Sequence, residues 1–504
     1  MILSVVTSIF NFVGALALLL WGMDLLSAGI QKGAGDKLQK LLSVVSGNRF
    51  TAVLTGLFVT AIIQSSSATT VMVVSFVNAQ IISLTQAIGI IFGANIGTTV
   101  TAWIVSLLGF SFKISVVAIP FIGIGFFMKS LKNKVKDFGD MIMGFGLLFL
   151  GLDLLGDTLT LNPESVGFIN GITNFGFWGI ILGVLLGTVL TAVIHSSSAF
   201  TAIVITMAAT GSLTWDLSAA LVLGSNIGTT IDAILSSLGA TTNAKRTALV
   251  HVLFNVSGTI IALIFLRPLL NFVDFITPGE ANSNIAVHIA MLHTIFNTSC
   301  TILFLPFVNQ IAKLTERVIK PQKNETPSFY KFEFSQVGIR ENSEAAVICA
   351  EKEISDMTDI VIEMFQRIQK GFSQRNENFI TENMEKLSGY EDYADQMQEE
   401  ISKFLVNCQT LPLNDKLRNN ISMMLRIVDD LESLTDDCYS VAVLIKRSVE
   451  KKMEFAQEDL ERLDPYMDLV QHFLEFIKEN INKTFLPLLT KGSKILITTS
   501  ELAP

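Results

Sequence analysis

Charged side chains are scarce in the first 310 residues of this 504-residue chain, which hold 23 of its 81 Asp, Glu, Lys and Arg residues. Half of all residues are hydrophobic, and the mean hydropathy of +0.52 is high for a soluble protein. The charge-poor part followed by a charge-rich part predicts an integral membrane domain and a separate soluble C-terminal domain.

The sequence also lacks a basic tract and paired cysteines, and each absence excludes a class of function. The net charge is −9 and no basic tract that could follow a phosphate backbone is present, so we expect no nucleic-acid partner. The four cysteines have no CxxC spacing, which supports neither a disulfide framework nor a zinc site. No catalytic constellation is visible, so we do not expect an enzyme. The first apolar segment, about 5–30, lacks a basic start and a cleavage site, and we interpret it as a transmembrane helix.

The apolar part contains an internal repeat with an offset of 131 residues. GLFVTAIIQSSSATT begins at Gly56 and GTVLTAVIHSSSAFT begins at Gly187. At the same offset, GANIGTTV begins at Gly93 and GSNIGTTI begins at Gly224. Repeated halves of this kind are common in secondary transporters.

The distribution of basic residues predicts that the two halves are inverted. Three loops of the apolar part are basic: 32–49, 129–136 and 245–246. The positive-inside rule places such loops in the cytoplasm, so an even number of crossings must separate the first two. Segment 50–79 is therefore predicted to be a re-entrant hairpin, and its first arm of about 21 Å is shorter than a hydrocarbon core of about 30 Å. Segment 176–209 is its counterpart.

The predicted fold class is all-α: a polytopic membrane protein with two inverted repeats, each containing a re-entrant helical hairpin and a broken helix, followed by a cytoplasmic antiparallel helical bundle. We expect a multi-pass protein of the plasma (cell inner) membrane, with its N-terminus outside and its C-terminal domain in the cytoplasm. The predicted parts are a membrane transport domain, 1–312, with repeat A at about 5–130, repeat B at about 138–266 and an extra span at 287–311; a linker, 313–342; and a helical domain, 343–504.

The two serine runs form the first candidate site. A helix broken at membrane depth leaves N–H groups unpaired that must line a protected cavity. The N-terminus of the following half-helix attracts anions, and serine hydroxyls add donors. The alternative is a straight helix whose serines bond back to carbonyls four residues earlier. The predicted anion-binding residues are Gln64, Ser65, Ser66, Ser67, His195, Ser196, Ser197 and Ser198.

A cation site is predicted beside the anion site. No Lys or Arg lies near either serine run, so helix dipoles and co-bound cations must hold the anion, which favours cation-coupled symport. The glycines of the second motif, Gly93 and Gly97 with Gly224 and Gly228, either open a helix or allow tight helix contact. The predicted sodium ligands are Ser66, Thr69, Asn95, Thr98, Thr99, Ser197, Thr201, Asn226, Thr229, Thr230 and Asp232.

Four acidic residues lie in apolar segments, where a charge is costly and indicates a function. Asp24 and Asp153 occupy matching repeat positions, which suits helix capping as well as function. Asp157 is placed at the outer boundary, where exposure is the simpler interpretation. Asp232 aligns with Thr101 of the first half, so the symmetry of the repeat breaks there, and we assign it to ion binding or charge balance.

Three of the four histidines in the apolar part have different expected roles. His195 replaces Gln64 of the first half and either takes up a proton or makes the hydrogen bonds of Gln64 as a neutral imidazole. His251 and His293 each stand four residues before an Asn, in HVLFN and HTIFN, which indicates paired packing positions on adjacent helices.

These motifs resemble the type II sodium–phosphate cotransporters, in their bacterial form with an appended PhoU-like domain. The resemblance covers about residues 10–310 and is carried by QSSSATT at Gln64–Thr70, HSSSAFT at His195–Thr201, GANIGTT at Gly93–Thr99, GSNIGTT at Gly224–Thr230 and KRTALVHVLFN at Lys245–Asn255. It implies sodium-driven uptake of inorganic phosphate by an elevator-like or related alternating-access movement, with phosphate and Na⁺ contacting Gln64–Ser67 and Ser196–Ser198. His195 departs from the second Gln usual in the family, which puts ion stoichiometry and pH dependence in doubt.

Two alternative functions stay open at this point. One is a cation-coupled carrier of another small anion, such as sulfate or a carboxylate. The other is a phosphate-responsive membrane regulator that signals through the C-terminal domain.

Apolar residues of the C-terminal part recur at helical spacing and predict an antiparallel bundle with helices near 343–371, 375–408, 414–447 and 452–493. Asp464-Pro465 is expected to interrupt or kink the last helix. YEDYADQ and DDLESLTDD resemble PhoU helices and place carboxylates four residues apart, either as solvated surface or as a weak divalent-metal site. The candidate ligands are Glu391, Asp395, Glu432 and Asp436. We expect a regulatory or oligomeric role, through a cytoplasmic partner or a second copy.

Overall fold

The computed structural model describes residues 2–43, 48–79, 81–109, 115–131, 134–161, 171, 175–281, 283–320, 330, 343–411, 413, 415–453 and 457–481. Within these ranges every regular element is a helix, which confirms the all-α class. The chain divides into two compact units, one built mainly on Met1–Pro321 and the other mainly on Ser343–Pro504. Most of the predicted linker lies outside the described residues.

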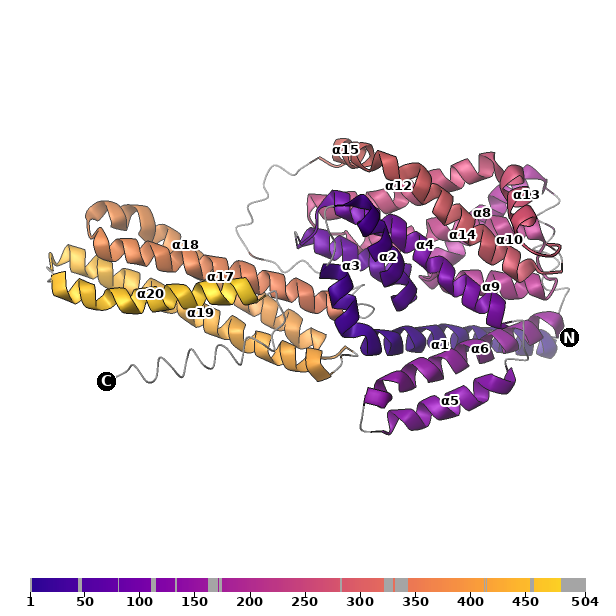
Figure 1. The fold of residues 1–504 in the computed structure, drawn as a ribbon, viewed down its shortest axis with the longest axis horizontal. Helices are drawn as coiled ribbons and strands as arrows, with labels where there is room; N and C mark the ends of the chain where they lie inside the picture. Colours follow the sequence, from indigo (N-terminus) through magenta and orange to yellow (C-terminus); the bar gives the residue numbers. More distant parts are fainter. Residues whose placement is uncertain are drawn as a thin grey trace. The chain divides into compact units, whose positions relative to one another are not determined.

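The helices of the larger unit follow the repeat (Figure 1). Those of the first half are α1 (Ile2–Ser43), α2 (Arg49–Ile63), α3 (Ser66–Asn78), α4 (Leu84–Gly109) and α5 (Ser115–Lys129). Those of the second half are α6 (Asp137–Leu161), α8 (Phe177–Ile194), α9 (Ser197–Ala209), α10 (Trp215–Gly228), α11 (Thr230–Ser236) and α12 (Thr242–Ile264). Three more helices follow among the described residues: α13 (Leu266–Ile276), α14 (Ile285–Phe304) and α15 (Val308–Val318).

Seven helical stretches of the described residues are long and apolar enough to cross a membrane, which together with the apolar composition supports a membrane protein. They are Ile9–Ile30, Leu84–Gly109, Phe138–Thr158, Phe177–Ile194, Trp215–Ser236, Thr242–Ile264 and Ile285–Val318. The outer faces of α5 and α8 expose large apolar side chains, among them Phe127 and Val193, both 72% exposed. Such faces suit contact with lipid.

Equivalent helix pairs pack tightly through the glycines of the second motif. A Cβ on Gly93 would lie 1.9 Å from the Val53 carbonyl oxygen of α2, and a Cβ on Gly224 would lie 2.0 Å from the Val184 carbonyl oxygen of α8. Only glycine allows α4 to approach α2, and α10 to approach α8, this closely. These contacts hold the helix that precedes each serine run against a long neighbour.

The predicted opening of the helix at Gly93 and Gly97 is wrong, because α4 is continuous from Leu84 to Gly109. The alternative, tight helix contact, describes these glycines instead. In the second half the helix is interrupted at Thr229, between α10 and α11. The two halves therefore differ in one helix that the repeat makes equivalent.

Helix α1 packs along α6, and α5 packs on the other side of α6 (Figure 1). Gly22 and Gly29 of α1 meet the α6 backbone, since a Cβ on either would lie 2.3 Å or less from a backbone nitrogen. A hydrophobic core joins α1, α4, α6, α9, α10 and α14, with Leu19, Phe149 and Leu155 fully buried in it. This core includes Phe200 and Ile205 of α9, so it holds the helix that follows the second serine run.

The described residues of the smaller unit form four long helices: α17 (Ser343–Ser373), α18 (Glu377–Cys408), α19 (Asp415–Glu450) and α20 (Gln457–Asn480). Helices α17, α18 and α19 pack on one another around a core that includes Met364, Leu387 and Ala442, and α20 packs on α17. Helix α20 continues through Pro465 and is not interrupted there, and the end of its predicted range, 482–493, lies outside the described residues.

Candidate functional site

Two helix breaks, one in each half, share the same backbone geometry. Helix α2 ends at Gln64 with φ 61°, and α8 ends at His195 with φ 59°, both in the left-handed region that non-glycine residues rarely adopt. The amide of Gln64 donates to the Thr60 carbonyl at 2.7 Å, and that of His195 donates to the Thr191 carbonyl at 2.8 Å. The alternative of a straight helix through the serine run is therefore wrong in both halves.

The first serine of each run starts the next helix. The Ser65 side chain accepts a hydrogen bond from the Ala68 amide at 3.1 Å, and the Ser196 side chain accepts one from the Ala199 amide at 3.2 Å. Serine is favoured at this N-cap position for this reason. The hydroxyl oxygens of Ser65 and Ser196 thus stabilise the helix starts.

The second and third serines of each run carry the features of an anion site. Ser66 and Ser67 are the first two residues of α3, so their amide N–H groups have no acceptor within the helix, and Ser197 and Ser198 have the same position in α9. All four side chains are buried, between 4% and 6% exposed. Each run therefore offers two amides and two hydroxyls at a helix N-terminus.

A side-chain contact joins each break to a neighbouring helix, α4 in the first half and α11 in the second. In the first half the Thr101 hydroxyl donates to Gln64 Oε1 at 2.9 Å. In the second half His195 Nδ1 lies 2.6 Å from Asp232 Oδ1. Both residues of the second pair stand 131 positions after those of the first, so His195 makes the contact that Gln64 makes, with a carboxylate in place of a hydroxyl.

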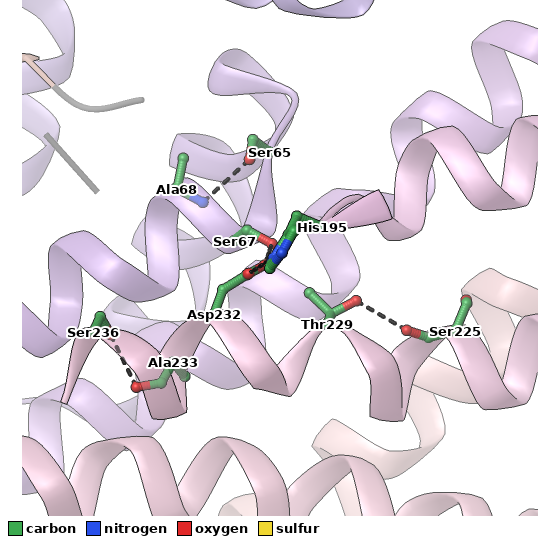
Figure 2. A network of polar contacts seen from close by, with 9 residues as sticks. All are labelled: Ser65, Ser67, Ala68, His195, Ser225, Thr229, Asp232, Ala233 and Ser236. Carbon is green, nitrogen blue, oxygen red and sulfur yellow. Dashed lines mark hydrogen bonds and ion pairs between the residues drawn. The ribbon is translucent and has the colours of Figure 1, made fainter. Parts of the chain in front are cut away.

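The two halves meet at Asp232. Its second oxygen, Oδ2, accepts a hydrogen bond from the Ser67 hydroxyl of the first half at 2.5 Å. Figure 2 shows Ser67, His195 and Asp232 pointing toward one another from α3, the α8–α9 break and α11. The packing of α3 on α11 makes this contact possible. The carboxylate is 4% exposed and links Ser67 of the first serine run to His195, which directly precedes the second run.

The predicted sodium ligands of the second motif are arranged alike in both halves. Asn95 Nδ2 donates to the Ile91 carbonyl and Asn226 Nδ2 donates to the Val222 carbonyl, so the amide oxygens are the atoms that could bind a cation. The amide oxygen of Asn226 also lies 3.3 Å from His293 Nε2 and keeps one lone pair beside that contact. The four threonine hydroxyls donate back to carbonyls three or four residues earlier in the chain, so only their lone pairs face outward. These threonines are Thr98, Thr99, Thr229 and Thr230.

Thr70 was not among the predicted sodium ligands, although its position resembles that of the predicted ligand Thr201. The hydroxyls of Thr70 and Thr201 are buried and have no hydrogen-bond partner among the described residues. They occupy matching repeat positions, four residues after Ser66 and Ser197, so that each lies on the same helix face as a serine. Thr69, which sequence analysis chose instead, accepts from Thr60 and donates to the Ser65 carbonyl. The repeat offset was the signal that could have found Thr70.

Helices α12 and α14 extend the correspondence between the halves. HVLFNVSGT of α12 and HTIFNTSCT of α14 place His, Asn and Thr at the same spacing. The Thr259 hydroxyl donates to the Leu223 carbonyl of α10, and the Thr301 hydroxyl donates to the Phe92 carbonyl of α4, both at 3.3 Å. His293 Nε2 also lies 3.3 Å from Asn226 Oδ1. The two His-bearing helices thus pack on the two GxNIGTT helices.

Of the four acidic residues singled out in apolar segments, only Asp232 is buried beside the serine runs. Asp24, Asp153 and Asp157 are exposed. Asp216, at the start of α10, forms a salt bridge with Arg267 of α13, whose Nη2 lies 3.0 Å from Asp216 Oδ2. The charge of the Arg267 guanidinium is therefore paired with a carboxylate.

Three of the four predicted metal ligands of the smaller unit lie together. Carboxylate oxygens of Glu391, Asp395 and Asp436 are within 4.8 Å of one another, whereas Glu432 is not part of this group. Burial, followed by repulsion from Asp395, raises the pKa of the Glu391 carboxyl. Acidic groups this exposed are common without an ion, so the metal site stays a prediction.

Comparison with known proteins finds a family model for each unit. A family model described as Na⁺/Pi-cotransporter matches residues 18–157 and 174–296, and a PhoU domain model matches residues 354–445. No solved structure matches the chain.

Of three curated relatives that match the chain, two are named for phosphate transport or export. The "Putative inorganic phosphate export protein YjbB" of Salmonella typhimurium is 30% identical over 282 residues, 56% of this chain and 51% of that protein. The "Uncharacterized protein YqeW" of Bacillus subtilis is 31% identical over 277 residues, 54% of this chain and 87% of that protein. The human "Sodium-dependent phosphate transport protein 2C" is 36% identical over 131 residues, 24% of this chain and 22% of that protein. The chain spans about half the length of the first of these relatives.

Proposed function

The chain belongs to the Na⁺/Pi-cotransporter family, a family of transporters and not of enzymes, and from this premise we propose that it carries inorganic phosphate inward, coupled to Na⁺. The observation that supports this most is the pair of helix breaks at Gln64 and His195. Each places free amides and serine hydroxyls at a buried helix N-terminus, which is the chemistry of a phosphate site. Two such termini suit alternating access around one ligand.

We propose that phosphate contacts the serine runs directly, with Gln64 and His195 as the residues that shape the breaks. Its amide donors are those of Ser66, Ser67, Ser197 and Ser198. Sodium is proposed to bind beside them, where the Thr70 and Thr201 hydroxyls and the amide oxygens of Asn95 and Asn226 supply oxygen ligands. The positive charge of Na⁺ then offsets the negative charge of the anion, because no Lys or Arg lies near either serine run.

A second candidate function is export of phosphate. The relatives called YjbB are named as phosphate export proteins. The same binding site could serve either direction of transport, because the ion gradient sets the direction. In both cases we propose that the bundle of α17–α20 lies in the cytoplasm and acts as a regulatory or oligomerisation unit, as the PhoU domain match and the positive-inside rule favour.

The experiment is uptake of labelled phosphate into proteoliposomes that contain the full chain, with an inward Na⁺ gradient, an equal K⁺ gradient, or neither. We expect accumulation only with Na⁺. Equal uptake with K⁺ would refute the proposed coupling to Na⁺. If no phosphate moves under any gradient, the proposed transport function is refuted. Comparing right-side-out with inside-out membrane vesicles then separates uptake from export.

A further inference from the structure

The Ser67 hydroxyl has its single hydrogen committed to a carboxylate. It donates to Asp232 Oδ2 at 2.5 Å, and an ionised carboxylate can only accept. The remaining capacity of Ser67 Oγ is therefore its lone pairs. Toward a ligand at the serine run, Ser67 presents an acceptor and not a donor.

His195 holds that carboxylate in place from the other side. Its Nδ1 lies 2.6 Å from Asp232 Oδ1, so the two oxygens of Asp232 are held by one group from each half of the molecule. Charge-assisted hydrogen bonds this short are strong and orient both partners. Helices α3, α8, α9 and α11 contain no Lys or Arg, so none of these four helices supplies a cation to neutralise Asp232.

The other half has a different arrangement. Ser198 is the counterpart of Ser67, and Thr101 is the counterpart of Asp232. Thr101 is neutral and donates its hydrogen to Gln64 Oε1, so the first half supplies no carboxylate to take up a serine hydrogen. One serine of the site is thus fixed as an acceptor, in a site whose other groups are mainly donors.

We propose that Asp232, acting through Ser67, makes the site select a tetrahedral oxyanion that carries a hydrogen on at least one oxygen. Such an anion donates to Ser67 and accepts from the surrounding amides. Phosphate and arsenate meet this requirement near neutral pH, whereas sulfate and selenate have no hydrogen to donate. This inference rests on the proposed function and names the residue that sets its specificity.

The physical reason is the cost of an unpaired acceptor. A fully deprotonated anion would place an oxygen against the Ser67 lone pairs, with the Asp232 charge directly behind them. A site built to hydrogen-bond a ligand hydroxyl rejects the analogue without it by about 10⁴- to 10⁵-fold in well-studied cases. Because Na⁺ and the amides attract both kinds of anion, we expect a smaller difference, of at least about 100-fold.

The test is competition for labelled phosphate uptake by the full chain in proteoliposomes with a Na⁺ gradient. Arsenate and selenate form a pair of similar size, and phosphate and sulfate form another. For the wild-type chain we expect arsenate to compete at concentrations about 100-fold below those at which selenate or sulfate competes. In Asp232→Asn the side-chain amide can donate to Ser67 Oγ and release its hydrogen toward the ligand, so we expect sulfate and selenate to compete nearly as well as arsenate.

Two further variants keep the test decisive. Asp153→Asn makes the same change in an exposed residue of α6, and it should keep the wild-type selectivity ratio. Ser67→Ala removes the acceptor itself and should lower the ratio as Asp232→Asn does. If a variant does not transport, binding of the same labelled anions to the detergent-solubilised chain gives the ratio instead.

Particular results would overturn the inference. Wild-type uptake of phosphate that sulfate inhibits as well as arsenate does would refute the selectivity while leaving phosphate transport intact. A ratio in Asp232→Asn as large as in the wild type would refute the role of Asp232. A wild-type chain that neither binds nor moves phosphate would overturn the proposed function itself, and the inference with it.

Discussion

The two helix breaks have nearly the same backbone and different chemistry. At Gln64 and His195 the φ angles differ by two degrees, 61° against 59°, and the same capping bonds surround them. Yet one break is tied by a hydroxyl–amide contact and the other by an imidazole–carboxylate contact. The difference teaches that the shape of the site and its charge are set by separate groups.

The shape depends on backbone groups and on one serine. The left-handed residue is held by its own amide, which bonds to a carbonyl four residues earlier, and the next helix is capped by Ser65 or Ser196. Because neither bond uses the side chain of the left-handed residue, Gln and His both fit there. Asp232 can therefore replace the hydroxyl of Thr101 and bring a charge to the site without altering the break.

The variants with the largest expected effect on phosphate uptake test whether both halves bind the ligand. Ser66→Ala and Ser197→Ala should each lower the initial rate of phosphate uptake by about 100-fold, since each loses a buried contact to an ionic ligand and such bonds contribute about 1.5–3 kcal/mol. Proteoliposome uptake measures this, with membrane insertion checked separately. Ser75→Ala is the control, because Ser75 only bonds back to the Val71 carbonyl and should transport normally. Wild-type kinetics in both site variants would refute the assignment.

The next effect tests whether the two halves pack alike. Gly93→Ala and Gly224→Ala each place a Cβ about 2 Å from a carbonyl oxygen of the neighbouring helix. We expect each to lower the free energy of unfolding by about 1–3 kcal/mol, as overpacking does. Thermal unfolding in detergent, followed by tryptophan fluorescence, reports on this unit because Trp21, Trp103, Trp178 and Trp215 all lie in it.

Gly123 provides the matched control. No atom lies within 4 Å of a Cβ built there, so Gly123→Ala in α5 should leave stability unchanged or raise it by up to about 1 kcal/mol. If only one of Gly93→Ala and Gly224→Ala lowers the free energy of unfolding, the two halves do not pack alike.

The smallest effect tests whether the two tying contacts are interchangeable. The double variant His195→Gln with Asp232→Thr gives the second break the residues of the first. Asp232→Thr alone leaves His195 without its carboxylate, so we expect the double variant to be more stable than the sum of the single changes predicts. The coupling should be about 1 kcal/mol, within the range for residues in contact. Strictly additive changes in unfolding free energy would show that His195 and Asp232 act independently.

Much of the site was open to prediction because it is local in sequence. A polar run inside an apolar segment, a serine at an N-cap and a repeat offset are all visible without a structure, and they placed one break within segment 50–79 and the other within segment 176–209. The role of Gly93 was not open in this way. A glycine permits both a helix opening and a close helix contact, and only the neighbouring Val53 carbonyl shows which one occurs.

The sequence by itself determined the apolar helices, the repeated halves and the two serine runs at which the breaks occur, because hydrophobicity and capping act over a few residues. Only the tertiary structure decided that Ser67 donates to Asp232, since these residues are 165 positions apart and belong to different halves. The same packing of α3 on α11 turned a serine expected to donate to the anion into an acceptor. No local pattern carries that information, because the hydrogen of a hydroxyl goes to whichever acceptor the fold brings beside it.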